Sequence, residues 1–295
     1  LPSGMYWETA EAIGDKIYVI GGYDMGPPLN TVHILDTATG TWSQGEPMPQ
    51  SVQIPSSAVY NGEIYVFPVN YKYNPSTNSW TSFTAPPSGH GDAAEAVTVG
   101  DAIYLIGGNE GYIYEAYTTS EKYDPQGDTW TSGPELNIGR YQFGAAYLGG
   151  NIYAIGGRNE AANSEATVEI LPIAGSWSFS PSLNTARHGL DVIEFNGKLY
   201  AIGGWNGSNV LEVLDPVTGT WTPLSPLPEG QSGLAAARVD DQIYTFGSYG
   251  VEDTTQIYDI SEDTWSSGPS LPSGMYWETA EAIGDKIYVI GGYDM

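Results

Sequence analysis

The feature that most constrains the fold is a unit of about 45 residues that occurs six times. Each unit contains an apolar run such as IYVIGG (Ile17–Gly22), followed after a variable gap by a Trp. The runs start at Ile17, Ile64, Ile103, Ile152, Leu199 and Ile243, and the tryptophans are Trp42, Trp80, Trp130, Trp177, Trp221 and Trp265. From each Trp to the next Tyr of a run is 23 or 24 residues, whereas Tyr to Trp varies from 15 to 26. Units this short must stack on one another to bury their apolar faces, which predicts one repetitive domain.

Within a unit the pattern is all β. Asn61-Gly62 and Asn196-Gly197 stand just before an Ile-Tyr or Leu-Tyr pair, as in a tight hairpin. A later turn signal reads DTATGTW from Asp36, DPQGDTW from Asp124 and DPVTGTW from Asp215. No segment keeps a helical period over three turns. We therefore expect four antiparallel strands in each unit.

A Gly-Gly pair that ends the second strand, a Tyr three residues earlier and a Trp after the later turn recur together in four of the six units. In these marks the chain resembles the kelch repeat. The resemblance implies an all-β, six-bladed β-propeller with four antiparallel strands per blade around a channel. The expected propeller covers residues 1–270, with blades at about 1–50, 51–89, 90–139, 140–186, 187–230 and 231–274. The repeated Tyr and Trp side chains are interpreted as the core between blades.

Residues 271–295 repeat residues 1–25 letter for letter, at an offset of 270, which is 6 × 45. Either copy could pair with the strand expected at Thr31 to Asp36. If the C-terminal copy, residues 271–295, pairs there, it closes the ring with two strands from each end of the chain. The remaining copy would then be a surplus hairpin whose unpaired edge is a template for another molecule, so residues 271–295 are expected to be a ring-closing or an intermolecular hairpin. Three origins stay open: one period of a longer tandem array, an engineered overlap, or a natural swap element.

The charge of the chain excludes several partners. Nine basic residues against 35 acidic ones give a net charge of −26, which repels nucleic acid phosphates and anionic lipid surfaces. No run approaches the 18 apolar residues that cross a bilayer, so we expect no membrane insertion. The scarcity of Lys and Arg favours an extracellular or cell-surface protein. The absence of Cys excludes disulfides and thiol chemistry.

Candidate ligand-binding residues lie in the loops that share one face of the expected ring. The kelch pattern often has an Arg thirteen residues before the Tyr, and Arg140 and Arg187 match it. The resemblance implies that these two line a central pocket for acidic peptides, and Arg158 follows Gly156-Gly157 on the same face. The alternative is that each Arg pairs with a carboxylate such as Asp191 or Glu160. Aromatic side chains of the same loops suit sugar or peptide contacts, or else rim packing: Tyr6, Trp7, Tyr23, Tyr141 and Trp205.

Enzymatic alternatives are narrowed by what the chain lacks. Kelch-type copper radical oxidases need a Cys, so that chemistry is excluded. The three His residues fall on different blades, which disfavours a shared metal site. Resemblance to six-bladed kelch enzymes that act on sialic acid would make Arg140 or Arg187 a carboxylate holder and Glu95 or Asp191 a base. We expect instead that Glu95 and Asp191 line the channel.

The sequence thus predicts a kelch propeller that acts without catalysis, as a structural and recognition module of a repetitive, extracellular assembly such as a tandem array, fibre or surface protein. Its expected partners are protein, through self-association of the duplicated hairpin, or carbohydrate. No cofactor is expected, and Ca²⁺ on the acidic loops stays open. The alternative is a monomeric propeller that binds an anionic peptide or a sugar acid through Arg140, Arg158 and Arg187.

Overall fold

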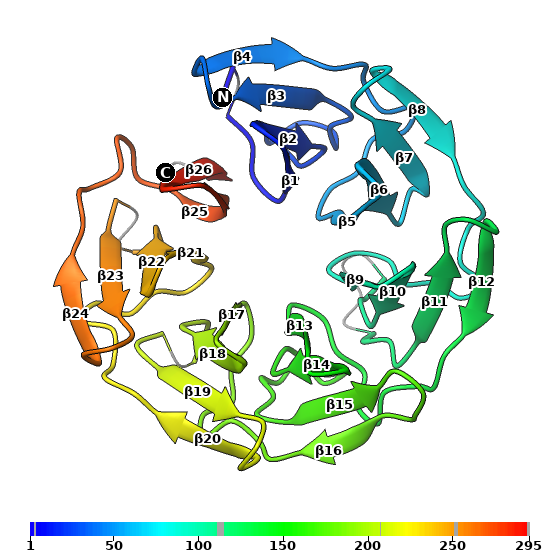
Figure 1. The fold of residues 1–295 in the computed structure, drawn as a ribbon. Coiled ribbons are helices and arrows are strands. Elements are labelled where there is room, and N and C mark those ends of the chain that lie inside the picture. The colour runs from blue at the N-terminus through cyan, green and yellow to red at the C-terminus, as the bar shows by residue number, and fades with distance from the viewer. Residues whose placement is uncertain (3, 111–114, 207, 251–252, 294–295) are drawn as a thin grey trace.

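A computed structural model describes residues 1–2, 4–110, 115–206, 208–250 and 253–293. Its strands form six four-stranded antiparallel sheets and one two-stranded sheet, and strands follow chain order across each sheet. We call the four-stranded sheets blades 1 to 6 and the two-stranded sheet the half-blade. Figure 1 shows them arranged radially, with the first strand of each blade innermost. The predicted six-bladed all-β propeller is therefore confirmed, with the half-blade added.

The strands are short, as is usual for propeller blades. Blades 1 to 3 comprise β1 (Thr9–Ile13), β2 (Lys16–Ile20), β3 (Val32–Asp36), β4 (Thr41–Gln44), β5 (Ser56–Tyr60), β6 (Glu63–Phe67), β7 (Tyr71–Asn74), β8 (Ser79–Ser82), β9 (Glu95–Val99), β10 (Ala102–Ile106), β11 (Ser120–Asp124) and β12 (Thr129–Ser132). Blades 4 to 6 comprise β13 (Gly144–Leu148), β14 (Asn151–Ile155), β15 (Val168–Pro172), β16 (Ser178–Ser180), β17 (Asp191–Phe195), β18 (Lys198–Ile202), β19 (Leu211–Asp215), β20 (Thr220–Pro223), β21 (Ala235–Val239), β22 (Gln242–Phe246), β23 (Thr255–Asp259) and β24 (Thr264–Ser267). The half-blade comprises β25 (Tyr276–Ile283) and β26 (Lys286–Tyr293). Across the described ranges, no segment forms a helix long and apolar enough to cross a membrane.

The tight hairpins have the backbone that their sequences predict. Asn61 and Gly62 have φ values of 50° and 75°, and Asn196 and Gly197 have 48° and 74°. Two successive left-handed residues make the turn whose twist matches that of the flanking strands. These turns join the first two strands of blades 2 and 5.

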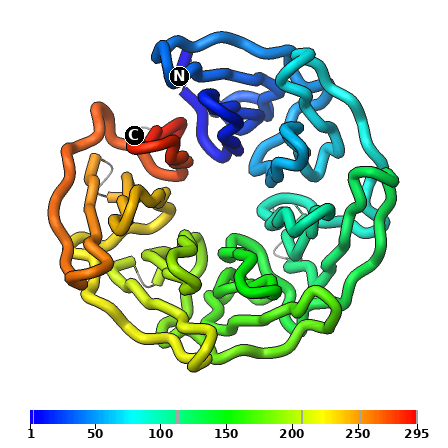
Figure 2. The backbone as a smooth tube through the Cα atoms, viewed as in Figure 1, coloured from blue at the N-terminus to red at the C-terminus, as the bar shows by residue number. Residues whose placement is uncertain are grey.

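The two copies of the 25-residue stretch occupy different settings. The N-terminal copy supplies β1 and β2, and β2 pairs with β3 from Lys16↔Asp36 to Ile20↔Val32. The C-terminal copy is the surplus hairpin, and its β25 packs between β21 and β1 (Figure 2). Among the described residues, β26 pairs with β25 alone. The last two residues of this copy, 294 and 295, lie outside the described residues.

Side chains between blades form the core, as predicted for the repeated aromatic residues. One cluster joins Tyr65 and Phe67 of blade 2 to Ile103 and Tyr123 of blade 3. Trp indoles also bridge blades, since Trp130 Nε1 donates to the Thr84 carbonyl at 2.6 Å. The Trp indoles of blades 2 and 6 donate in the same way to the preceding loops. The packed interfaces hold the inner strands around the channel.

Candidate functional site

A ring of left-handed residues surrounds one mouth of the central channel. Each lies eleven residues before the Tyr of its unit, and the seven are Trp7, Ile54, Ala93, Gln142, Gly189, Gly233 and Trp277. Their φ values lie between 49° and 65°. Hydrogen bonds connect neighbours, for example from Ile54 N–H to the Trp7 carbonyl at 3.0 Å and from Trp277 N–H to the Gly233 carbonyl at 2.9 Å. Backbone strain held by surrounding structure is typical of ligand-binding positions.

The ring encloses a cavity of about 400 Å³. Large side chains stand beside the two glycine positions, because the Trp277 ring leans over Gly233 and the Trp205 ring over Gly189. Trp7, Trp205, Trp277 and Gln142 all line the cavity. The side chains of this ring therefore shape the cavity at the mouth of the channel.

Aromatic rings form a continuous series along one side of the mouth, which we call the aromatic arc. It runs through Trp205, Tyr249, Tyr276, Tyr293, Tyr6 and Trp7. Successive ring centroids are 5.7, 5.5, 5.5, 5.1 and 4.9 Å apart, within the range of favourable aromatic contacts. Tyr249 is 53% exposed. The arc extends from blade 5 across the half-blade to blade 1.

The candidate aromatic residues divide into partly exposed and buried side chains. Trp7 and Trp205 are partly exposed and line the cavity, so they lie on the predicted face of the ring, and their binding role stays a prediction. Tyr23 is also partly exposed, and its ring centroid is 5.4 Å from that of Tyr6. Tyr6 and Tyr141 are buried, so rim packing describes these two better.

Carboxyl groups line the inside of the channel. Burial raises the pKa of Glu95 to about 8, and the charge of Asp191 adds to the shift. Burial also raises the pKa of Asp191, although the N–H groups of Val192 and Ala236 donate to it at 2.7 and 2.8 Å. The pKa of Glu11 rises to about 7 through burial, partly countered by a hydrogen bond from Ser57 Oγ. Burial, with Glu11 and Asp191 nearby, raises the pKa of Glu281 to about 8. With pKa values of about 8, Glu95 and Glu281 are mostly protonated near neutral pH and can donate hydrogen bonds to an uncharged ligand.

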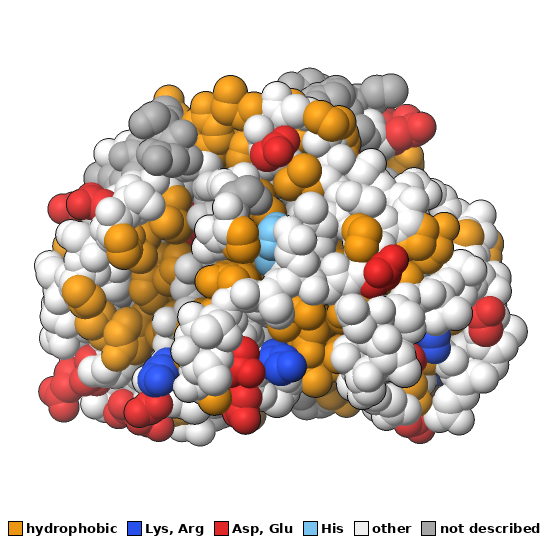
Figure 3. Space-filling view, turned by 90° about the horizontal axis from the view of Figure 1, so that it is seen from above, with side chains coloured by type: hydrophobic (Ala, Val, Ile, Leu, Met, Phe, Trp, Pro, Cys, Tyr) orange, Lys and Arg blue, Asp and Glu red, His pale blue; other side chains and the backbone are white. Residues whose placement is uncertain are grey.

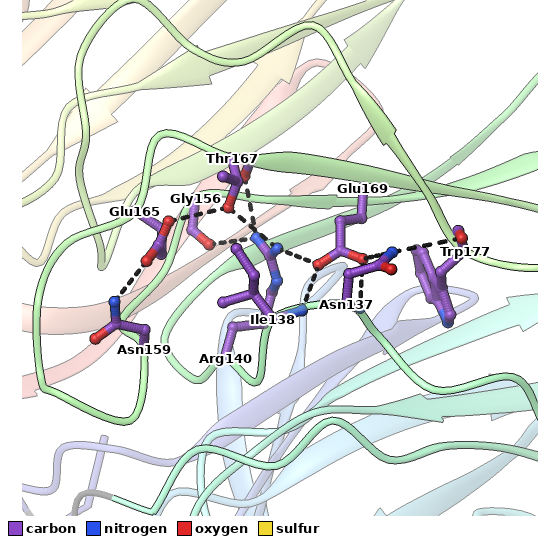
Figure 4. A network of polar contacts seen from close by, with 9 residues as sticks. All are labelled: Asn137, Ile138, Arg140, Gly156, Asn159, Glu165, Thr167, Glu169 and Trp177. Atoms are coloured by element: carbon purple, nitrogen blue, oxygen red, sulfur yellow. Dashed lines mark hydrogen bonds and ion pairs between the residues drawn. The ribbon is translucent and has the colours of Figure 1, made fainter.

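Arg140 lies in the interior of blade 4 and does not line the cavity. Its side chain is fully buried, and Nη2 contacts Glu169 Oε1 at 2.6 Å (Figure 4). Nη1 donates to the carbonyls of Gly156 at 2.8 Å and Thr167 at 3.0 Å. Burial lowers the Arg140 pKa, and Glu169 opposes that shift. This arrangement ties the loop before strand β13 to strand β15.

Arg187 repeats the arrangement one blade further on. It is fully buried, pairs with Glu212 and donates from Nη2 to the Ala201 carbonyl at 3.0 Å. The prediction that Arg140 and Arg187 line a central pocket is therefore wrong, because both guanidinium groups are sealed inside blades. The alternative of pairing with a carboxylate is confirmed, with Glu169 and Glu212 in place of Glu160 and Asp191. In this chain, the two Arg side chains at the kelch-pattern position therefore stabilise blades 4 and 5.

Arg158 stays near the mouth face. It is partly exposed, Nε donates to the Ala162 carbonyl at 3.2 Å, and the guanidinium lies 5.8 Å from the centroid of the Tyr141 ring. Glu95 and Asp191 lie in the channel, as predicted, but neither buried Arg joins them. The structure thus lacks the arginine half of the sugar-acid arrangement at these positions. Within the described residues, no three His, Asp or Glu side chains are grouped as metal ligands.

Three residues of the site, and the register that the ring residues share, were missed by sequence reasoning. Trp277, Gln142 and Glu278 also line the cavity, and the shared register of the mouth ring was not recognised. Aligning the units on their Tyr and reading the column eleven residues earlier would have found the ring, since this column holds two Trp, one Gln and two Gly.

The fold is a β-propeller with a cavity at one mouth of its channel, and comparison with known proteins gives its family. The Kelch motif matches residues 9–49, 93–137, 139–184 and 186–228, more than half of the chain, which therefore belongs to the kelch-repeat family.

The chain is 31% identical over 177 residues to Kelch-like protein terF of Aspergillus terreus, covering 51% of this chain and 38% of that protein. It is 30% identical over 175 residues to mouse (Mus musculus) Kelch-like protein 35, covering 56% of this chain and 29% of that protein. The chain thus spans about a third of the length of these relatives. A solved structure entitled "Structure of YjhT" superposes on this chain with a TM-score of 0.72. The superposition covers 90% of this chain and 98% of the chain in that structure. At 16% identity this likeness shows the fold alone.

Proposed function

We propose that this kelch propeller is a non-catalytic interaction module whose surplus hairpin joins copies of the chain into a repetitive, extracellular assembly. The observation that carries the proposal is the edge of β26, which pairs with nothing beyond β25 among the described residues. A free strand edge is a template for a strand of another molecule.

An apolar groove lies beside this edge. It measures about 530 Å³ and is lined by Tyr244 and Phe246 of β22, Ile287 and Val289 of β26, and the loop around Leu271. In the side view of Figure 3, hydrophobic side chains gather at the left, where Figure 1 places blade 6 and the half-blade. The groove occupies the place that the outer two strands of a seventh blade would cover.

The strand pair β3–β4 of a second copy fits this vacancy best. β26 carries the same residues as β2, whose edge pairs with β3 in a five-residue register. In the second copy, β3 is already paired with its own β1–β2 hairpin. For β26 of the first copy to pair with β3, it must displace that hairpin, which has the same sequence. The number of strand pairs stays constant in this exchange, so the favourable free energy comes from covering the apolar groove. Assembly should therefore depend on concentration.

Light-scattering mass after size exclusion tests the proposal. The full chain should form oligomers as its concentration rises, whereas residues 1–270 should stay monomeric. Val289→Lys places a charge in the groove without removing the hairpin, and it should abolish oligomers too. Equal monomeric masses for all three proteins over the whole concentration range would refute self-association.

The channel mouth supports a second function, capture of a ligand by the propeller face. Aromatic rings and protonated carboxyls suit a neutral sugar or a peptide without net negative charge, because Arg140 and Arg187 do not reach the cavity. Titration of Trp fluorescence with neutral oligosaccharides and with basic and acidic peptides tests this. A response that disappears in Trp277→Ala but persists in Trp42→Ala, on the outer strand β4, supports the mouth. A response equal in both variants, or none, contradicts it.

A further inference from the structure

One slot in each blade is apolar in five units and acidic in the two copies of the hairpin. It lies ten residues before the Tyr and holds Glu8, Pro55, Ala94, Phe143, Leu190, Leu234 and Glu278 in chain order. Leu190 lies against Gly156 and Leu234 against Gly203, so the slot residue packs on the first glycine of the Gly-Gly pair in the preceding blade. The slot is therefore an apolar contact between neighbouring blades.

The two glutamates fill this slot on the two sides of the half-blade. Glu278 of the half-blade lies against Gly247 of blade 6, and Glu8 of blade 1 lies against Gly291 of the half-blade. Each junction that holds the half-blade in the ring thus contains a carboxyl group at the edge of the channel cavity, where the other five junctions contain hydrocarbon or a proline ring.

Among the described residues, neither carboxyl group has a charged partner or a side-chain hydrogen bond. All four oxygens are buried, and only backbone N–H groups lie near enough to favour the charged form. No ion pair involves either residue within the part of the chain that the structure describes. An ionised carboxylate without a partner is strongly unfavourable in such a place, whereas a protonated one is tolerated.

The groups that face these junctions reinforce the effect. The two carboxyls repel each other, since Glu278 raises the pKa of Glu8. On the neighbouring inner strands the acidic groups in the channel are Glu11, Glu281 and Asp191. Within the described ranges, the cations of the flanking strands, Lys16, Lys286 and Arg238, form no ion pair with either glutamate, and Arg238 stacks on Phe195. The backbone N–H groups of the two glutamates and of Ala235 offset only part of the penalty.

The direction of the pH effect follows from the raised pKa values. Burial raises the pKa of Glu8 and of Glu278 from 4.5 to about 8. The closed half-blade binds these protons more tightly than an opened one. The stability that these two protons give to the closed half-blade is therefore fully present below about pH 4.5 and is lost as the pH rises through about 8.

We infer that the half-blade is a pH-gated latch: loss of the protons on Glu8 and Glu278 releases β25–β26 from between blades 6 and 1. The hairpin is suited to this role because one edge of its two-stranded sheet is free, and isolated hairpins are marginally stable. Release also frees the hairpin to reach another molecule. The latch is a property of the single chain and does not depend on the proposed self-association.

A pair of cysteine probes tests the latch. The chain has no Cys, and Ile290 of β26 and Ile20 of β2 are the same position of the repeated stretch, 3% and 0% exposed. Thiol labelling of Ile290→Cys and Ile20→Cys is measured from pH 5 to 9 on dilute monomer. The labelling rate at each pH is divided by the labelling rate of the same protein when unfolded at that pH. This division removes the effect of ionisation of the thiol itself.

Labelling at position 290 should rise steeply between pH 5 and 8, with each ionising carboxyl contributing about a factor of ten per pH unit. Labelling at position 20 should change far less. The double substitution Glu8→Leu with Glu278→Leu restores an apolar slot. It should remove about two factors of ten per pH unit from the rise in labelling rate at position 290. If that protein does not fold, Glu8→Gln with Glu278→Gln should give the same loss of slope. Glu95→Gln, which removes a channel carboxyl of blade 3, should leave the slope unchanged. Equal slopes at the two probes, or a slope at position 290 that neither pair of substitutions lowers, would overturn the latch.

Discussion

Truncation of one isoleucine in each copy of the repeated stretch should separate the two settings of the same sequence. Ile17 is fully buried in a cluster with Val19, Leu35 and Ile290, whereas its twin Ile287 is only half-buried beside the groove. Ile→Ala removes three carbons, worth about 0.8 kcal/mol each in transfer. Ile17→Ala adds a cavity on top of this, for a total loss of about 3 to 4 kcal/mol. For Ile287→Ala, water fills the vacated space and about half of the transfer term remains, roughly 1 kcal/mol.

Urea unfolding followed by far-ultraviolet circular dichroism and Trp fluorescence measures both losses, each as the change in midpoint multiplied by the slope of the transition. The local sequences are identical, so helix or strand propensity and local structure in the unfolded chain cancel between the variants. Ile17→Ala should shift the main transition. Ile287→Ala should move only a minor early phase in which the half-blade opens. Equal shifts of the main transition would refute the assignment of the N-terminal copy to blade 1.

Three further predictions follow from single contacts. Gly107→Ala should destabilise the propeller by about 2 kcal/mol more than Gly149→Ala by thermal melting, because both have left-handed backbones but only Gly107 faces a neighbouring carbonyl, that of Arg140. Arg187→Met should reduce stability by about 3 to 5 kcal/mol, since Glu212 stays buried without its partner; adding Glu212→Leu should recover most of the loss, and no recovery would contradict this. The melting temperature should fall from pH 5 to 8, because burial raises the pKa of Glu95 to about 8 and its proton stabilises the folded chain; Glu95→Gln should reduce the fall, and an unchanged pH profile would count against it.

The fold could be predicted because its determinants are local and repeated. Each repeated motif specifies a backbone conformation or a packing contact within one unit or with the next unit. These motifs are the Asn-Gly turns, the Gly-Gly pairs and the periodic Tyr and Trp. The repeated ends also predicted a surplus hairpin correctly. Its position between blades 6 and 1 was not predictable, since it depends on whether the ring can open to admit a seventh inner strand.

The candidate site was harder to predict because burial decides what a charged residue does. Arg140 and Arg187 matched a slot that lines a pocket in other kelch proteins, yet here Glu169 and Glu212 lie two strands away and bind them inside the blades. Those two carboxylates stand in register on β15 and β19, but the pairing joins residues 29 and 25 positions apart, and a single sequence gives no sign of it. Trp7 and Trp205 were correctly placed because a loop position fixes the face of the ring.

The slot of Glu8 and Glu278 shows why the two copies of one hairpin cannot be equivalent in function. In a ring of complete blades an acidic residue at every such junction would weaken all of them alike. Here the duplication puts the acid only at the two junctions of the half-blade, while Pro, Ala, Phe and Leu secure the other five. The other five junctions therefore have no ionisable group in this slot, and the two acids stand where one hairpin can leave without taking a strand from any complete sheet. A propeller that carries a spare copy of its first hairpin can tolerate this weakness, because blade 1 keeps its own four strands when the half-blade opens.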